Sequence, residues 1–83
     1  MNKEIRNQII NLSKFVFSDQ EYNKAMIYLK SNNLNNLRLF IDEKYEYLDA
    51  LCSLDSSDNV LGQQLIYCDE LENIVMDAYL ITK

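Results

Sequence analysis

The chain has 83 residues, of which 48% are hydrophobic, and its eight Lys or Arg and thirteen Asp or Glu give a formal net charge of −5. A chain of this length builds one hydrophobic core, so we expect a single domain over residues 1–83. The sequence holds one Gly, no Pro and no His. This composition argues against hairpin-rich β folds, glycine-rich phosphate loops and histidine-based catalysis, and it favours an all-α protein that is not an enzyme.

Charge is distributed unevenly along the chain. Residues 1–38 contain six basic and three acidic residues, a net charge of +3, whereas residues 39–83 contain two and ten, a net charge of −8. Between Lys44 and Lys83 there are eight carboxylates and no basic residue. Solvated helices usually alternate charges and gain pairs three or four residues apart, so this segment accepts self-repulsion. The pattern indicates a basic partner, although ordinary solubility of an acidic protein also explains it.

Two short helices are predicted in the first part of the chain. Apolar residues at helical spacing predict a first helix over about residues 2–16. Ser18 and Glu21 have the spacing of a capping box, which predicts that a second helix covers about residues 19–31. The apolar stripes of these two helices are Ile5, Ile9, Leu12 and Val16, then Tyr22, Ala25, Met26 and Leu29. Asn32 and Asn33 offer a left-handed residue that ends the second helix and a cap for the next one.

Two longer helices are predicted in the second part. They cover about residues 34–54 and 58–81 and are joined by a short polar turn, in which Ser56, Ser57 or Asp58 serves as the N-cap of the fourth helix. A turn this short makes the two helices an antiparallel hairpin. We therefore expect a compact four-helix bundle, with two short N-terminal helices and a long helical hairpin.

Acidic residues gather on the predicted solvent side of both long helices. Helical spacing places carboxylates opposite the apolar stripe of each helix, and two tyrosines flank them on the third helix. Tyrosine beside carboxylates suits the binding of Lys and Arg at a desolvated interface. The candidate partner-binding residues are Asp42, Tyr45, Glu46, Tyr47, Asp49, Asp69, Glu70 and Asp77.

Two charged residues interrupt the apolar stripes of the long helices. Lys44 falls within the stripe of the third helix and Glu72 within that of the fourth. In an antiparallel hairpin these positions lie about one helical turn apart, within reach of a lysine side chain. We predict a Lys44–Glu72 ion pair that fixes the register of the hairpin.

No cofactor or metal site is predicted. The segment from Asp55 has oxygen-bearing residues at alternate positions like a calcium loop, but Val60 replaces the required Gly and Ile66 the bidentate Glu. Cys52 and Cys68 lie too far apart along the hairpin for a disulfide, and we expect both to be buried thiols. The basic residues of the first part are dispersed, so direct binding to nucleic acid is not expected.

Targeting features are also not expected. The apolar pattern of the first 17 residues is interrupted by charges and amides, and no apolar run has the length of a signal sequence or membrane span. We therefore expect a cytoplasmic protein that does not bind a membrane.

One family resemblance adds to these inferences. Glu21 and Tyr22 are followed by Ala25 and Leu29, by a polar break, and then by residues 37–43, which lead into the acidic helix. This layout, over about residues 19–49, resembles small helical immunity proteins of bacterial polymorphic and contact-dependent toxin systems, the MafI-like group. The resemblance implies a binder that neutralises a toxin, but no particular binding residues.

Two classes of function follow. In the first, the chain is a non-catalytic inhibitor that neutralises a basic toxin or nuclease by stoichiometric binding through its acidic C-terminal half, either as an immunity protein or as a phage-encoded inhibitor of a host defence nuclease. In the second, it is a homodimeric structural or regulatory module. A thin bundle leaves several apolar residues without a place in the core, and a homodimer would bury them. These residues are Ile10, Phe15, Phe17, Ile66, Met76 and Leu80.

Overall fold

The computed structural model describes residues 1–55 and 57–82, the last of them by its backbone, and shows four α-helices in these residues. They are α1 (Lys3–Val16), α2 (Asp19–Lys30), α3 (Leu34–Leu54) and α4 (Asn59–Thr82). Each predicted helix boundary lies within one residue of the observed one. The predicted all-α four-helix bundle is confirmed.

Side-chain caps set the starts of the first two helices. The Asn2 side chain accepts a hydrogen bond from the backbone N–H of Glu4 at 2.7 Å. At α2, the predicted capping box is present: the Ser18 N–H donates to Glu21 Oε1 at 2.9 Å, and the Glu21 N–H donates to Ser18 Oγ at 3.4 Å. Both bonds satisfy N–H groups that the first turn of a helix leaves free. The capping box also fixes the Glu21 carboxylate at the start of α2, where it contacts Lys44 of α3.

The break between α2 and α3 has the predicted geometry. Asn32 has a φ of 57°, the left-handed conformation that ends helices, and Asn is among the residues that adopt it most readily. The next residue, Asn33, caps α3 by accepting a hydrogen bond from the Asn36 N–H at 3.4 Å. Two consecutive asparagines therefore turn the chain without a glycine.

The turn between α3 and α4 is capped by Asp58. Its Oδ1 accepts hydrogen bonds from the N–H groups of Val60 at 3.0 Å and Leu61 at 3.2 Å. Ser57 instead donates to Asp55 Oδ1 through its N–H and its hydroxyl group. Of the three predicted caps, Asp58 is the one used, and Ser56 lies outside the described residues.

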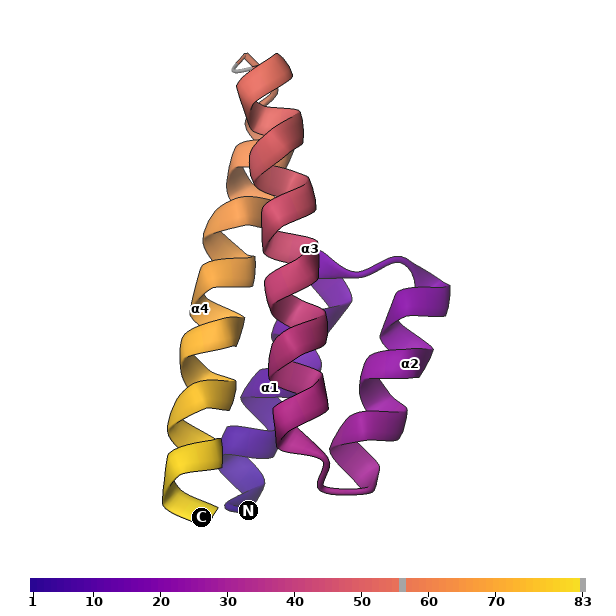
Figure 1. Cartoon of the computed structure of the whole chain (residues 1–83), viewed down its shortest axis with the longest axis vertical. Helices are drawn as coiled ribbons and strands as arrows, with labels where there is room; N and C mark the ends of the chain where they lie inside the picture. Colours follow the sequence, from indigo (N-terminus) through magenta and orange to yellow (C-terminus); the bar gives the residue numbers. More distant parts are fainter. Residues whose placement is uncertain (56, 83) are drawn as a thin grey trace.

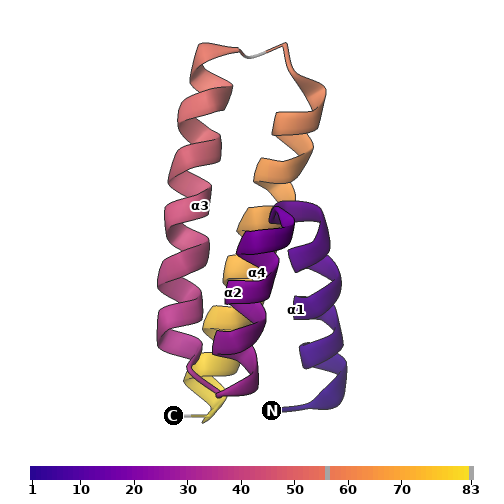
Figure 2. The same cartoon turned by 90° about the vertical axis from the view of Figure 1, so that its right-hand side faces the viewer.

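The helices run alternately up and down, and α3 and α4 lie side by side as a long hairpin (Figure 1). Helix α2 contacts α3, α1 contacts α4, and α1 and α2 contact each other. The link between the two short helices lies partway along the hairpin, so the end of the hairpin projects beyond both of them (Figure 2). At 1.5 Å per residue, the 21-residue α3 is about 13 Å longer than the 12-residue α2.

The core runs between the four helices. Its buried apolar residues are Ile9, Val16, Phe17, Ala25, Leu29, Leu34, Leu37, Ile41, Leu48, Cys68, Leu71, Val75 and Ala78. The buried Ser13 is satisfied because its hydroxyl donates to the Ile9 carbonyl at 2.6 Å. The sequence analysis left Phe17 without a core place, and this was wrong. The extended backbone after α1 turns its ring inward, where it packs 5.2 Å from the ring of Phe40.

Among the described residues, no helix combines the length and the apolar character needed to cross a membrane.

Candidate functional site

Three carboxylates form one edge of α3. Asp42, Glu46 and Asp49 are spaced by four and three residues, so they project from the same side of the helix. Glu46 and Asp49 are exposed, and Asp42 is half-buried where α3 meets α4. Tyr45 lies between this edge and the core and is half-buried.

Two carboxylates of α4 face this edge. Asp69 is exposed, and Glu72, one helical turn further along, is half-buried. Both are close enough to act on the Tyr45 hydroxyl, whose pKa is raised by burial and then by the negative charges of Asp49 and Asp69 and, more weakly, of Glu72. We call these five carboxylates and Tyr45 the acidic face: Asp42, Tyr45, Glu46, Asp49, Asp69 and Glu72.

Glu72 and Asp42 meet across the α3–α4 interface. The pKa of Glu72 is raised by burial first, then by the negative charge of Asp42 and by a hydrogen bond between the two carboxyl groups, with a further contribution from Asp69. Two carboxyl groups that share a hydrogen bond hold one proton more tightly than either would alone. The acidic face therefore contains a site of crowded negative charge, which a cation would relieve.

Arg38 lies at one end of the acidic face. It lowers the pKa of Glu72 and so opposes the effect of Asp42 in part. Its Nη2 donates to Asn35 Oδ1 at 3.1 Å, which directs the guanidinium group along α3. Within the described residues, its buried Nε has no hydrogen-bond partner.

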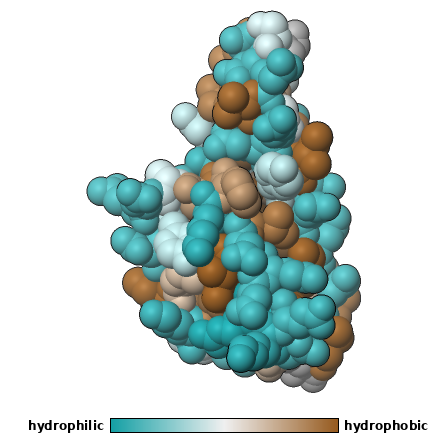
Figure 3. Space-filling model, turned by 180° about the vertical axis from the view of Figure 1, so that it is seen from behind, coloured by the Kyte–Doolittle hydropathy of each residue, from teal (hydrophilic) through white to brown (hydrophobic). Residues whose placement is uncertain are grey.

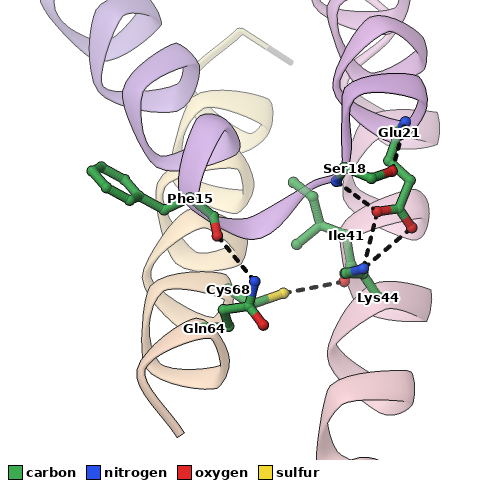
Figure 4. A network of polar contacts seen from close by, with 7 residues as sticks. All are labelled: Phe15, Ser18, Glu21, Ile41, Lys44, Gln64 and Cys68. Atoms are coloured by element: carbon green, nitrogen blue, oxygen red, sulfur yellow. Dashed lines mark hydrogen bonds and ion pairs between the residues drawn. The ribbon is translucent and has the colours of Figure 1, made fainter. Parts of the chain in front are cut away.

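Lys44 does not pair with Glu72, and the predicted Lys44–Glu72 bridge was wrong. Its Nζ lies 2.9 Å from Oε1 and 3.3 Å from Oε2 of Glu21 at the start of α2 (Figure 4). Lys44 is two residues, about 200° around α3, from the Asp42 edge, so it faces α2 rather than α4. The capping box holds Glu21 in place to receive it. The bond to Glu21 leaves Glu72 beside Asp42.

Three of the sequence-predicted residues lie away from the acidic face. Tyr47 is on the α2 side of α3, 59% exposed, with its ring centroid 5.4 Å from Lys44 Nζ. Glu70 lies on the opposite flank of α4, where it lines a shallow groove with Leu12 of α1. Asp77 is two helical turns further along the same flank, and it is exposed. Predicted residues that the structure does bring together are Asp42, Tyr45, Glu46, Asp49 and Asp69.

Glu72 is the residue of this face that the sequence analysis did not include. The sequence analysis predicted that Glu72 forms an ion pair with Lys44, because these two opposite charges interrupt the apolar stripes of neighbouring helices. That prediction did not consider α2, whose Glu21 binds Lys44 instead. A signal was nevertheless present: Glu72 follows Asp69 by three residues, the spacing that places two side chains on one helix face.

The cysteine thiols are not reactive groups of this face. Cys68 is fully buried, and its thiol donates to the Ile41 carbonyl at 3.6 Å (Figure 4). Burial, followed by the charge of Glu72, raises the pKa of Cys68 to about 12, so the nucleophilic thiolate does not form near neutral pH. Both cysteines are free, as predicted, but Cys52 is half-buried, so the prediction that both are buried thiols is correct only for Cys68.

The described residues contain no group of three or more His, Cys, Asp or Glu side chains arranged to hold a metal ion. What the acidic face offers is therefore a set of hydrogen-bond acceptors and negative charge at the edge of an apolar interface. Such a surface can bind Lys or Arg side chains through charge-assisted hydrogen bonds.

Comparison of the chain with protein-family models, with curated proteins and with solved structures finds no match.

Proposed function

We propose that the chain is a non-catalytic protein-binding protein, an immunity-type inhibitor that neutralises a basic toxin or nuclease domain in the cytoplasm by stoichiometric binding. The acidic face is the binding surface. The observation that carries the proposal is the crowding of carboxyl groups where α3 meets α4: burial raises the pKa of Glu72, and the neighbouring Asp42 and Asp69 raise it further. A folded protein keeps such an unfavourable arrangement at a cost to its stability, and a basic partner would remove that cost.

Charge and position both support binding to a cationic groove. The chain carries a net charge of −5, and most of its acidic residues lie in α3, α4 and the turn between them. Neither α1 nor α2 packs over the Asp42 edge, because α2 contacts α3 from the Lys44 side and α1 contacts the Glu70 flank of α4. A partner can therefore approach Asp42, Glu46 and Asp49 directly. Opposite charges of this kind accelerate association and make it sensitive to salt.

Tyr45 adds an apolar component to the surface. It is half-buried among the carboxylates of the acidic face and packs against the core. A tyrosine in this position supplies contact area to the aliphatic part of an arginine or lysine, whose charged end reaches the carboxylates.

The first step of the experiment captures the partner. The tagged chain is incubated with lysate of its native host at low and at moderate salt, and bound proteins are identified by mass spectrometry. The proposal expects a basic nuclease or toxin domain that is retained at low salt and lost at moderate salt. Recovery of no basic protein at either salt concentration would overturn the proposal.

The second step localises the binding surface with two variants of equal net charge. One carries Glu46→Gln, Asp49→Asn and Asp69→Asn in the acidic face; the control carries Glu4→Gln, Glu70→Gln and Asp77→Asn elsewhere. All six positions are exposed, and each variant changes the net charge from −5 to −2, because three negative charges are removed.

We expect the acidic-face variant to bind the captured partner about 100-fold more weakly, because three contacts of about 1 kcal/mol each are lost. The control variant should keep its affinity within a few-fold, since only the long-range charge has changed. Equal losses in both variants would show that net charge, and not the acidic face, determines binding.

A further inference from the structure

Helices α1 and α4 enclose a groove on the flank of α4 that carries Glu70. Its volume is about 460 Å³, within the range of sites that bind small ligands. Leu12 and Ile74 are half-buried and pack against the core, so they form an apolar floor. The rest of the lining is polar and exposed. The residues that define this α1–α4 groove are Gln8, Asn11 and Leu12 of α1 and Glu70, Asn73 and Ile74 of α4.

Contacts between α1 and α4 fix the two walls of the groove relative to each other. The Phe15 carbonyl accepts a hydrogen bond from Gln64 Nε2 at 3.4 Å (Figure 4), and the Phe15 ring lies 5.5 Å from the Tyr67 ring. Ile9 of α1 and Leu71 of α4 are fully buried in the same core. The groove is therefore formed before a ligand binds, which lowers the entropic cost of binding.

Three carboxamide groups line the groove without a partner. Within the described residues, the side chains of Gln8, Asn11 and Asn73 form no hydrogen bond. Each carboxamide has a carbonyl oxygen that accepts and an amino group that donates. A peptide group has the same two functions, and in an extended segment they are free to pair, whereas a helix has already paired its own. The carboxamides therefore favour an extended peptide as the ligand.

Charge along the groove has one sign. Glu70 is the charged residue of the lining, and Glu4 and Asp77 continue the two walls at one end, four residues from Gln8 and seven residues from Glu70. The described part of α4 contains no basic residue, and the basic residues of α1 lie at least about 120° around the helix from Gln8. Those residues are Lys3, Arg6 and Lys14. The groove therefore attracts a basic side chain and repels the phosphates of a nucleic acid.

The spacing of the groove residues along α4 matches that of an extended chain. Glu70 precedes Ile74 by four residues, about 6 Å along the helix axis. Alternate residues of an extended peptide point to the same side and lie about 6.6 Å apart. A basic side chain can thus reach Glu70 while an apolar side chain two residues away lies on Leu12 and Ile74. Apolar side chains are visible among polar ones on the face of the molecule that α1 occupies (Figure 3).

We propose that the α1–α4 groove binds an extended peptide segment of a second protein, in which an apolar residue and a Lys or Arg are two positions apart. The three carboxamides pair with the peptide backbone, the floor contacts the apolar side chain, and Glu70 binds the basic one. This site goes beyond the proposed inhibition of a toxin and does not depend on it. Glu70 and Asp69 lie on different flanks of α4, so the groove and the acidic face can be occupied together.

A titration of the ¹⁵N-labelled whole chain with a synthetic peptide, followed by two-dimensional NMR, tests the site. The probe is the capped pentapeptide alanine-leucine-alanine-lysine-alanine. We expect saturable shifts confined to the amides of the groove residues and their neighbours, with a Kd on the order of 1 mM. No shift at several times this concentration, or shifts spread over all acidic residues, would overturn the proposal. Shifts of the groove amides when the chain alone is concentrated would show that a second copy occupies the groove, which would overturn it as well.

Two variants of unchanged net charge test the role of the carboxamides. One carries Asn11→Ala and Asn73→Ala in the groove, and the matched control carries Gln20→Ala and Asn23→Ala on α2. All four positions are exposed and alanine favours the helix, so both variants should fold. We expect the groove variant to bind the probe about 10-fold more weakly, because two hydrogen bonds are lost, and the control to bind it like the wild type. Equal affinities of these two variants would refute pairing with the peptide backbone.

Glu70→Gln tests the role of charge. This variant should bind the probe about 3-fold more weakly and should bind a second peptide, in which glutamine replaces the lysine, as the wild type does. An equal change for both peptides would contradict binding of the lysine by Glu70. The acidic-face triple variant keeps every residue of the groove, so it should bind both peptides like the wild type. Failure of the acidic face to bind a basic partner is therefore distinguishable from failure of the groove to bind a peptide.

Discussion

The pair between Lys44 and Glu21 is expected to stabilise the contact between α2 and α3. The perturbation is Lys44→Met, which keeps the length of the side chain, combined in a double-mutant cycle with Glu21→Gln. Glutamine at position 21 can still accept the hydrogen bond from the Ser18 N–H that completes the capping box, so the cycle isolates the ion pair.

The magnitude follows from the distance and the burial of the pair. At 2.9 Å, the attraction between unit charges is about 1.4 kcal/mol in bulk water and about 6 kcal/mol at an effective dielectric constant of 20. The side chains of Lys44 and Glu21 are 15% and 34% exposed, which places the pair between the surface and the interior. Desolvation and side-chain entropy offset most of the attraction, so we expect a coupling free energy of about 1–2 kcal/mol.

Urea denaturation of the wild type, the two single variants and the double variant measures this coupling. Burial opposes ionisation of Glu21, but the hydrogen bond from the Ser18 backbone and the contact with Lys44 outweigh it and lower the pKa below 4.5. The stabilisation is therefore present above pH 4.5 and is lost as the pH falls through the pKa of the folded state. A second cycle, between Lys44→Met and Glu72→Gln, is the control and should give a coupling within about 0.3 kcal/mol of zero. The structural account would be refuted if the Glu72 cycle gave the larger coupling.

Three further predictions concern single residues. The folded state raises the pKa of Glu72 above 4.5, so the stability of the wild type should fall as the pH rises from 4.5 through the folded-state pKa. In thermal denaturation, Glu72→Gln should therefore be more stable than the wild type at neutral pH and equal to it below pH 4.5. In the native protein at mildly alkaline pH, a thiol reagent should modify the half-buried Cys52 and spare the buried Cys68, as measured by mass spectrometry. Rapid modification of both cysteines would contradict the core position of Cys68. Ser18→Ala removes the cap of α2 and should lower the unfolding free energy by about 1 kcal/mol and the Tm by about 4–8 °C, whereas Ser31→Ala, whose hydroxyl only donates to the Ile27 and Tyr28 carbonyls, should change the Tm less.

Local features of the sequence were sufficient to predict the helices. The capping box at Ser18, the paired asparagines after α2 and the polar turn before Asn59 each act within a few residues, so their effect does not depend on the rest of the fold. Helical periodicity then assigned apolar and polar sides to α3 and α4. These short-range signals account for the agreement between predicted and observed boundaries.

Contacts between distant helices were not predictable in the same way. The partner of Lys44 depends on where α2 packs against α3, and a prediction from the α3–α4 hairpin alone does not include Glu21. The same prediction placed Asp69, Glu70 and Asp77 on one outer surface. The position of α1 separates them, since Glu70 lines the groove beside α1 while Asp69 lies near Tyr45. Solvent exposure alone does not distinguish two flanks of one helix.

The acidic face is tested most directly by the affinity of the captured basic partner for three chains at one salt concentration: the wild type, the acidic-face triple variant and the control triple variant of equal net charge. We predict that the acidic-face variant alone loses about 100-fold in affinity. Affinities that are the same for all three chains would contradict the assignment of binding to this face.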